Sequence, residues 1–268
     1  MPLAIFSDWH VEEEVDPAKV NGLNVYNLDI ADRCIDKLAE AYVAMIDDSP
    51  RFDCRTGVIC LLGDLFSGHI HPELLETTAL APQQTMVWLI DRVERMLRKI
   101  AATTHLERIV VACVSGNHGR ATEKIRVSTR EANSNEQVIY QTLARLLRDE
   151  PRFEFRIALG QWLELDVMSY QIAATHGDSF QYGGGVGGMS IPIRRGIARQ
   201  FQGRDFHQYL MGHFHQRQDF GDIQLNGSMI GYGSYSQWLH ARPEPRQQAW
   251  FMIDSERGKS LSTSLWME

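Results

Sequence analysis

Four short apolar runs, each followed at once by a polar cluster, constrain the fold more than any other feature of the chain. They are rich in β-branched residues and cover Leu3–Phe6, Val58–Leu62, Ile109–Val114 and Tyr170–Thr175. Continuous apolar runs of this length are typical of strands buried on both faces of a sheet. The sequence therefore predicts buried strands that carry functional groups at their carboxyl ends.

The segments between these runs have helical spacing of apolar residues. Asp29–Asp47 is predicted as a helix, and either Asn27 or Asp29 could cap its start. Pro82–Ile100 and Asn135–Leu147 repeat the pattern. Strands and helices thus alternate through the first half of the chain.

After about residue 153 the pattern changes to strands separated by turns. The candidates are Phe153–Leu159, Trp162–Val167, Tyr209–Met211, Ile223–Leu225, Ala249–Ile253 and Leu261–Leu265. The expected fold class is α/β (α+β), a mixed β-sandwich of two sheets flanked by helices. Because there is no internal repeat and no break in composition, one domain over residues 1–268 is expected.

Composition excludes some classes of function. A chain of 268 residues that is 44% hydrophobic can bury a sizeable core. Its net charge of −7 argues against a uniformly basic protein that coats nucleic acid. No apolar run approaches the length of roughly 20 residues that spans a bilayer, and the start of the chain lacks a basic flank. We expect a cytoplasmic protein without a membrane partner.

Neither the cysteines nor the glycine-rich segment indicates a functional site. Cys34, Cys54, Cys60 and Cys113 show no CxxC spacing, so reduced core residues are expected, with a disulfide pair as the open alternative. The stretch Gly183–Gly188 is interpreted as a loop. Its spacing does not fit a nucleotide-binding fingerprint, which disfavours a phosphate cradle.

Five polar clusters carry the chemistry. They are Asp8-x-His10, Gly63-Asp64, Gly116-Asn117-His118, His176-Gly177-Asp178 and Gly212-His213-Phe214-His215. A lone histidine is usually an ordinary core or surface residue, but together the clusters supply carboxylates, imidazoles and an amide at strand ends. In an extended strand, residues two apart face the same side, so Asp8 and His10 can reach one point. The same holds for His213 and His215 if their segment is extended.

The absence of cysteine from every cluster argues against a structural zinc site. Mixed carboxylate, imidazole and amide ligands suit Mn²⁺, Fe or a catalytic Zn²⁺. The site is therefore expected to be hydrolytic.

These motifs, in this order, resemble the five signature blocks of the calcineurin-like metallophosphoesterase family. They extend from Asp8 to His215. The resemblance implies a two-sheet sandwich and two divalent metal ions, with Mn²⁺ expected first and Fe or Zn²⁺ as alternatives. One ion would be held by Asp8, His10, Asp64 and His215, and the other by Asp64, Asn117, His176 and His213. Asp64 would bridge them.

The resemblance also implies a mechanism. Two metal ions about 3.5 to 4 Å apart share a hydroxide that attacks a phosphate ester. His118 would stabilise the transition state and protonate the leaving oxygen, although an imidazole that merely packs near the site is the alternative. Asp178 would stand behind the ligands and orient His176 or a metal-bound water.

The chain departs from the family pattern at two positions. The block around His118 commonly continues with Asp or Glu, but Gly119 stands here, and Ser67 replaces an Asp or His that supports the catalytic histidine. His118 is thus expected to lack its usual partner. His69 or His71 could substitute, and the alternative is that both are exposed loop histidines.

Two groups of arginines are candidates for gripping substrate phosphates. Arg120 and Arg126 follow the His118 block, and Arg194 and Arg195 follow the glycine-rich loop. The alternative is a solvated charged face, which is the usual role of such runs.

Finer motifs resemble a branch of the family found in phage and prophage genomes, which is distantly similar to the Mre11 and SbcD type of nuclease. They include Gly116–Arg120, the glycine-rich loop before an arginine pair, Asn226–Tyr232, and Gly63–Phe66. We therefore expect a DNA nuclease. The alternatives are a phosphodiesterase or phosphatase acting on nucleotides or other small phosphoesters, and a metal-binding interaction module without turnover. The expected partner is a phosphoester substrate such as DNA, and the sequence leaves the oligomeric state open.

Overall fold

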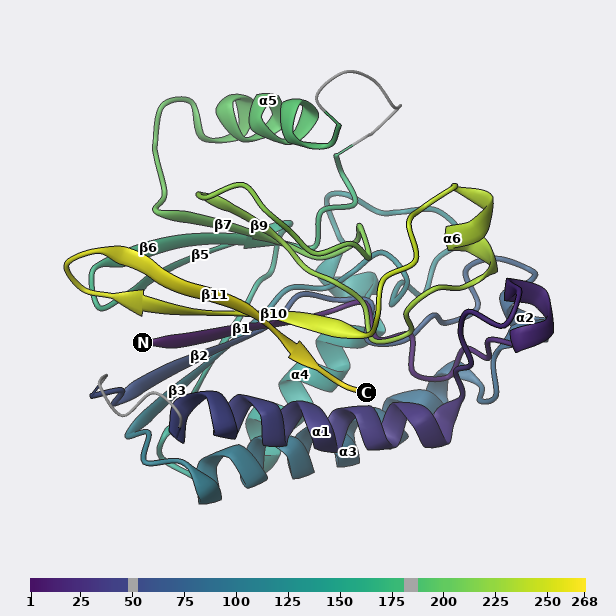
Figure 1. The fold of residues 1–268 in the computed structure, drawn as a ribbon, viewed down its shortest axis with the longest axis horizontal. Coiled ribbons are helices and arrows are strands. Elements are labelled where there is room, and N and C mark those ends of the chain that lie inside the picture. Colours follow the sequence, from purple (N-terminus) through teal and green to yellow (C-terminus); the bar gives the residue numbers. More distant parts are fainter. Residues whose placement is uncertain (48–52, 181–187) are drawn as a thin grey trace.

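Two β-sheets stack face to face, with helices on their outer faces (Figure 1). The computed structural model describes residues 1–47, 53–180 and 188–268. The loop predicted over Gly183–Gly188 lies almost wholly outside the described residues.

The first sheet has six strands in the order β11-β10-β1-β2-β3-β4. Its parallel strands are β1 (Pro2–Phe6), β2 (Thr56–Leu61), β3 (Arg108–Cys113) and β4 (Phe153–Ile157). Two antiparallel strands complete it at one edge, β10 (Gln247–Asp254) and β11 (Gly258–Trp266). Strand β1 therefore lies in the middle of the sheet, between β2 and β10.

The second sheet has five strands in the order β5-β6-β7-β9-β8. They are β5 (Trp162–Val167), β6 (Tyr170–Thr175), β7 (Gln208–Met211), β9 (Ile223–Leu225) and β8 (Gln218–Asp219). The three central strands are parallel and both edge strands are antiparallel. Both sheets are thus mixed, which confirms the predicted fold class.

Helices cover the outer face of each sheet. The first sheet is covered by α1 (Leu28–Asp47), α3 (Pro82–Thr103) and α4 (Asn135–Leu146), and the second by α5 (Ser190–Phe201). Four short helical segments lie in connections: η1 (Pro17–Val20), α2 (Leu74–Thr77), η2 (Glu131–Asn133) and α6 (Ser234–Trp238). None of the helices within the described ranges is long and apolar enough to cross a membrane.

The alternation of side chains along β1 explains why its sequence is apolar throughout. Leu3 and Ile5 point into the core between the sheets, whereas Ala4 and Phe6 point into the core beneath the helices. All four are fully buried. Burying a side chain of this kind contributes about 1.5–3 kcal/mol, so the strand is held on both faces.

A side-chain cap marks the start of α1. Oδ1 of Asn27 accepts a hydrogen bond of 2.9 Å from the backbone N of Ile30, so Asn27 and not Asp29 caps α1. All four cysteines are buried and free, as expected.

Candidate metal centre

Hydrogen bonds between loops fix the carboxyl ends of the strands as one unit. The backbone N of Asp8 donates to the carbonyl of Gly63 over 3.0 Å, and that of Trp9 donates to the carbonyl of Asp64 over 2.8 Å. The N of Met229 donates to the carbonyl of Asp8 over 3.0 Å. The loops that follow β1, β2 and β9 are therefore locked to one another before any ligand binds.

Five of the predicted metal ligands have left-handed backbone conformations. The φ angles are 56° at Asp8, 48° at His10, 52° at Asp64, 70° at His213 and 55° at His215. The expectation that Asp8 and His10 lie along an extended strand is wrong, because β1 ends at Phe6, although the two side chains do reach one point. The condition set for His213 and His215, an extended segment, is not met either. Each residue in the left-handed conformation costs about 1–3 kcal/mol and persists only where its surroundings hold it, as the interloop hydrogen bonds do here.

The structure brings six of the predicted ligands into two groups. Within each group the candidate ligand atoms all lie within 4.8 Å of one another. The first group is Asp8, His10 and His215, and the second is Asp64, His176 and His213. These are the two sets that the sequence motifs indicated, without the shared carboxylate and the amide.

In the first group, two imidazole nitrogens and a carboxylate oxygen lie close together. Nε2 of His10 lies 3.2 Å from Nε2 of His215, which in turn lies 3.4 Å from Oδ1 of Asp8. The hydroxyl of Ser67 donates to Glu13 over 2.8 Å, so it accepts the Nδ1 proton of His10, also over 2.8 Å. This chain fixes the tautomer of His10 and leaves its Nε2 available to a cation.

In the second group, an imidazole nitrogen likewise lies close to a carboxylate oxygen. Nδ1 of His176 donates to the carbonyl of Leu62 over 2.7 Å, and its Nε2 lies 3.0 Å from Oδ2 of Asp64 and 3.0 Å from Oδ1 of Asn117. Burial lowers the pKa of His176, but the Asp64 carboxylate raises it, with a net value of about 10. The position between these atoms therefore favours a positive charge, either a proton or a metal ion.

This donor set fits divalent metal ions. Carboxylate oxygens, imidazole nitrogens and an amide oxygen converge, and such ligands suit Mn²⁺, Fe or Zn²⁺. Asn117 lies beside the second group, as expected. The roles of these residues as ligands, and of Asp64 as a bridge, remain predictions.

His118 lies beside both groups and is held by the loop after β2. Its backbone N donates to Oδ1 of Asp64 over 2.8 Å, and its Nδ1 donates to the carbonyl of Ser67 over 3.0 Å. The ring centroids of His118 and His10 are 4.8 Å apart. Ser67 therefore orients His118 through its carbonyl and His10 through its hydroxyl.

His69 and His71, the two histidines proposed as partners of His118, do not take the supporting position. Nε2 of His69 lies 3.2 Å from Oγ1 of Thr78, so it does not support His118. The ring of His71 lies 6.3 Å from that of His118, and both loop histidines are exposed. The partner expected to be missing is supplied by the backbone of Ser67.

Two buried glutamates, Glu136 and Glu12, support the site although no motif contains them. The carboxylate of Glu136 accepts hydrogen bonds from the backbone N of Gly116 (2.6 Å) and of Leu65 (2.9 Å). Burial and the nearby Asp64 charge raise its pKa to about 7. A Cβ on Gly119 would lie 2.7 Å from Cγ of Glu136, so glycine at this position makes room for Glu136.

Glu12 plays the same part on the other side of the loop. Its Oε1 accepts from the backbone N of Ser67 over 2.9 Å and of Gly68 over 2.8 Å, and burial raises its pKa to about 7.

One signal in the sequence could have found Glu136, since it shares the buried face of α4 with Ile139, Tyr140 and Leu143 at helical spacing.

Asp178 has a partner other than the one expected. Its carboxylate forms a two-bonded ion pair with Arg130, over 3.0 and 3.1 Å, and both side chains are nearly buried. The nitrogens of His176 bond to other groups. The structure thus gives the orienting role at His176 to the Leu62 carbonyl, and the alternative that Asp178 orients a metal-bound water stays a prediction.

Of the four candidate phosphate-binding arginines, Arg120 and Arg126 line one small pocket, whereas Arg194 and Arg195 lie on α5. Arg120 donates to the carbonyl of Asn117 over 2.7 Å and so stabilises its own loop. Arg126 lines a small pocket of about 10 Å³ with Arg120, beside Asn117. On α5, Arg194 pairs with Asp222 over 2.7 Å and Arg195 is exposed. Helix α5 covers the outer face of the second sheet, away from α2 and α6 (Figure 1).

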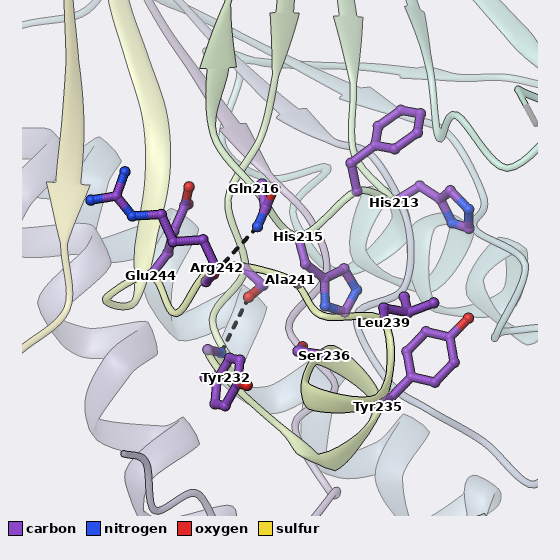
Figure 2. A pocket seen from close by; sticks show the side chains of 13 residues that line it. His213, His215, Gln216, Tyr232, Tyr235, Ser236, Leu239, Ala241, Arg242 and Glu244 are labelled. Atoms are coloured by element: carbon purple, nitrogen blue, oxygen red, sulfur yellow. Dashed lines mark hydrogen bonds between the residues drawn. The ribbon is translucent and has the colours of Figure 1, made fainter. Parts of the chain in front are cut away.

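A cavity of about 460 Å³ opens in front of both ligand groups. His10, Asp64, Asn117, His118, His213 and His215 form its floor, and Glu13, His71, Glu73, Tyr235 and Trp238 are among the residues of its walls. A smaller pocket of about 70 Å³ adjoins it and is lined by His213 and His215 on one side and by α6 on the other (Figure 2). The ligands are therefore accessible to a substrate.

No family model matches the chain, and no curated protein matches it. Among solved structures, Vps29 of Chaetomium thermophilum is 8% identical, with 95% of this chain and 85% of that chain covered and a TM-score of 0.40. The hypothetical protein PH1004 of Pyrococcus horikoshii OT3 is 13% identical, with 100% and 88% covered and a TM-score of 0.42. Likenesses this distant identify no family, so the argument for function rests on the site itself.

Proposed function

We propose that this chain is a phosphodiesterase that depends on two divalent metal ions, with DNA as its predicted substrate. The observation that carries the proposal is a pair of three-residue groups of candidate ligands, of which His10 and His215 from one group and Asp64 and His213 from the other line one cavity of about 460 Å³. Pockets of this size hold small molecules and nucleotides. A non-ligand histidine, His118, completes the arrangement.

The protein residues have distinct tasks in this proposal. Divalent ions bound by the two groups would supply Lewis acidity and lower the pKa of the attacking water. Because the Ser67 carbonyl holds the Nδ1 proton of His118, Nε2 is the atom that exchanges a proton with the leaving oxygen. The hydrogen bonds to Asp8, His10 and His176 hold the ligands in place beforehand, which favours catalysis through preorganisation.

Both departures from the family pattern have a local compensation, which supports turnover over a binding module without activity. The carbonyl of Ser67 supports His118, and the space that a side chain at position 119 would fill is occupied by Glu136. A site that had lost its function would not be expected to keep these supports together with every predicted ligand.

The proposal is tested with protein stripped of metal and then supplied with Mn²⁺. Hydrolysis of bis-p-nitrophenyl phosphate and degradation of single- and double-stranded DNA are measured for the wild type, Asp64→Ala and His118→Ala. His105→Ala, which removes an exposed histidine in the loop between α3 and β3, is the matched control. Loss of one general acid typically costs about 100- to 10,000-fold in rate.

Metal-dependent cleavage that survives in His105→Ala and is lost in both site variants supports the proposal. Degradation of DNA would separate a nuclease from an enzyme of small diesters. If the protein binds metal but hydrolyses none of these substrates, the proposal fails and a metal-binding interaction module is the better account.

A further inference from the structure

Two exposed aromatic rings stand at the mouth of the metal-site cavity. Tyr235 and Trp238, one helical turn apart on α6, are 65% and 74% exposed. Their ring centroids are 6.1 Å apart and the planes are tilted by only 19°, so the rings are stacked. We call this pair the α6 platform.

The platform and the ligand groups belong to one cavity. Both aromatic residues line the same cavity of about 460 Å³ as His10, Asp64 and His118. Tyr235 also lines the small pocket beside His215, and Figure 2 shows its ring and that of His215 in the walls of this pocket. A ligand whose phosphate reaches the metal ligands can therefore contact the platform at the same time.

The charges around the platform indicate what kind of group lies on it. A second hollow of about 460 Å³ adjoins the platform. Glu13 and Glu73 line both this hollow and the metal-site cavity, Glu14 and Asp16 line the hollow alone, and Lys19 is the basic residue among its described lining residues. This acidic surface repels a further phosphate by simple electrostatics. The platform is thus suited to a flat, uncharged ring that carries no additional phosphate beyond it.

We propose that the α6 platform is a nucleobase subsite, so that the substrates of the metal centre are phosphodiesters of a nucleoside whose base stacks on Trp238. This inference rests on the proposed phosphodiesterase function. Every nucleobase has a π-face, and stacking on an aromatic side chain contributes about 1–3 kcal/mol per base. The acidic hollow makes the bound nucleoside the terminal one, with the scissile phosphate on the side of the metal ligands.

The test compares three chromogenic diesters that share the same leaving group. They are thymidine 5′-p-nitrophenyl phosphate, the 5′-p-nitrophenyl phosphate of an abasic deoxyribose analogue, and methyl p-nitrophenyl phosphate. The measured quantity is the ratio of kcat/KM for the thymidine diester to that for the abasic diester. This ratio isolates the base, because sugar and leaving group are common to both.

The Mn²⁺-loaded wild type is expected to prefer the thymidine diester, and Trp238→Ala to reduce the ratio by about 5- to 150-fold. Trp238→Phe should retain most of the preference, since it keeps an aromatic face. Trp266→Ala, which removes a 52% exposed tryptophan at the end of β11, is the matched control and should leave the ratio unchanged.

The outcomes separate the two proposals. If the wild type hydrolyses all three diesters with the same kcat/KM, or if Trp238→Ala keeps the wild-type ratio, the nucleobase subsite is wrong while the phosphodiesterase stands. The exposed rings would then be a contact for another protein. If the wild type hydrolyses none of the three, including methyl p-nitrophenyl phosphate, the phosphodiesterase proposal itself fails.

Discussion

Single side chains behind the ligands determine how well the ligands are oriented. The hydroxyl of Ser67 connects Nδ1 of His10 to the carboxylate of Glu13. Groups in such positions are typically worth about 10- to 100-fold in metal affinity. The serine at this position thus has a structural role at the candidate site.

Ser67→Ala should therefore weaken Mn²⁺ binding by about 10- to 100-fold, because His10 loses the acceptor for its Nδ1 proton. The dissociation constant is measured by titration calorimetry. Ser260→Ala, an exposed hydroxyl on β11, should leave it unchanged. Equal affinity in Ser67→Ala and the wild type would show that the serine does not orient His10.

The pH dependence of metal binding follows from His176. Its folded pKa is raised to about 10 from 6.5, because the Asp64 carboxylate outweighs the effect of burial. Protonated His176 thus stabilises the metal-free fold fully below pH 6.5, and this contribution is lost as the pH rises through about 10. A metal ion must displace that proton.

Mn²⁺ affinity is accordingly expected to rise with pH up to about 10, by about tenfold per pH unit for one displaced proton. Calorimetry at pH 8 in buffers of different ionisation enthalpy measures the protons released. A binding enthalpy that is the same in all buffers would contradict a protonated His176.

At the scale of elements, the loop after β3 packs closely against one face of α4. Glu136 projects from α4 into the loop after β3, and Gly119 is the position that admits it. The element boundaries followed from the sequence wherever an apolar period was strong, as in β1 and α3. They did not for α5, which contains Pro192 and Gly196, nor for α6, which has only five residues.

Gly119→Ala should lower the free energy of unfolding by about 1–3 kcal/mol, because its Cβ would overlap with Glu136. Gly160→Ala is the matched control: its Cβ would have no atom within 4 Å, and the expected change is within about 0.5 kcal/mol. Both values are measured by urea unfolding. Equal stability of the two variants would mean that Glu136 moves aside at no cost.

The clustering of six predicted ligand residues could be predicted from the sequence, but their backbone conformation could not. The motifs around Asp8 and His213 identify chemistry by residue type and spacing. The left-handed conformations depend on hydrogen bonds from distant loops, such as that from Met229 to Asp8, and no local propensity encodes them. Glu12 is a similar case, because the backbone groups of Ser67 and Gly68 become its neighbours only in the folded chain.

At the scale of the whole molecule, the core between the two sheets connects the two sides of the candidate metal centre. Of the six clustered residues, Asp8, His10 and Asp64 follow strands of the first sheet, and His176, His213 and His215 follow strands of the second. Ile172 of β6 is fully buried in this core together with Leu3 and Leu210. We propose that the chain folds as one unit.

Ile172→Ala should therefore reduce the free energy of unfolding by about 2–5 kcal/mol within a single transition. Far-ultraviolet circular dichroism and tryptophan fluorescence are followed during urea unfolding, and their midpoints are expected to coincide. Two separate transitions, only one of them sensitive to the substitution, would indicate two domains.

We propose that the six clustered side chains and Asn117 form one dinuclear metal centre. The most direct measurement is the number of Mn²⁺ ions bound per chain together with the electron paramagnetic resonance spectrum of the loaded protein. We expect two bound ions with the spectrum of an exchange-coupled pair, and we expect the coupling to be lost in Asp64→Asn. One bound ion, or two ions whose spectra are those of isolated Mn²⁺, would contradict it.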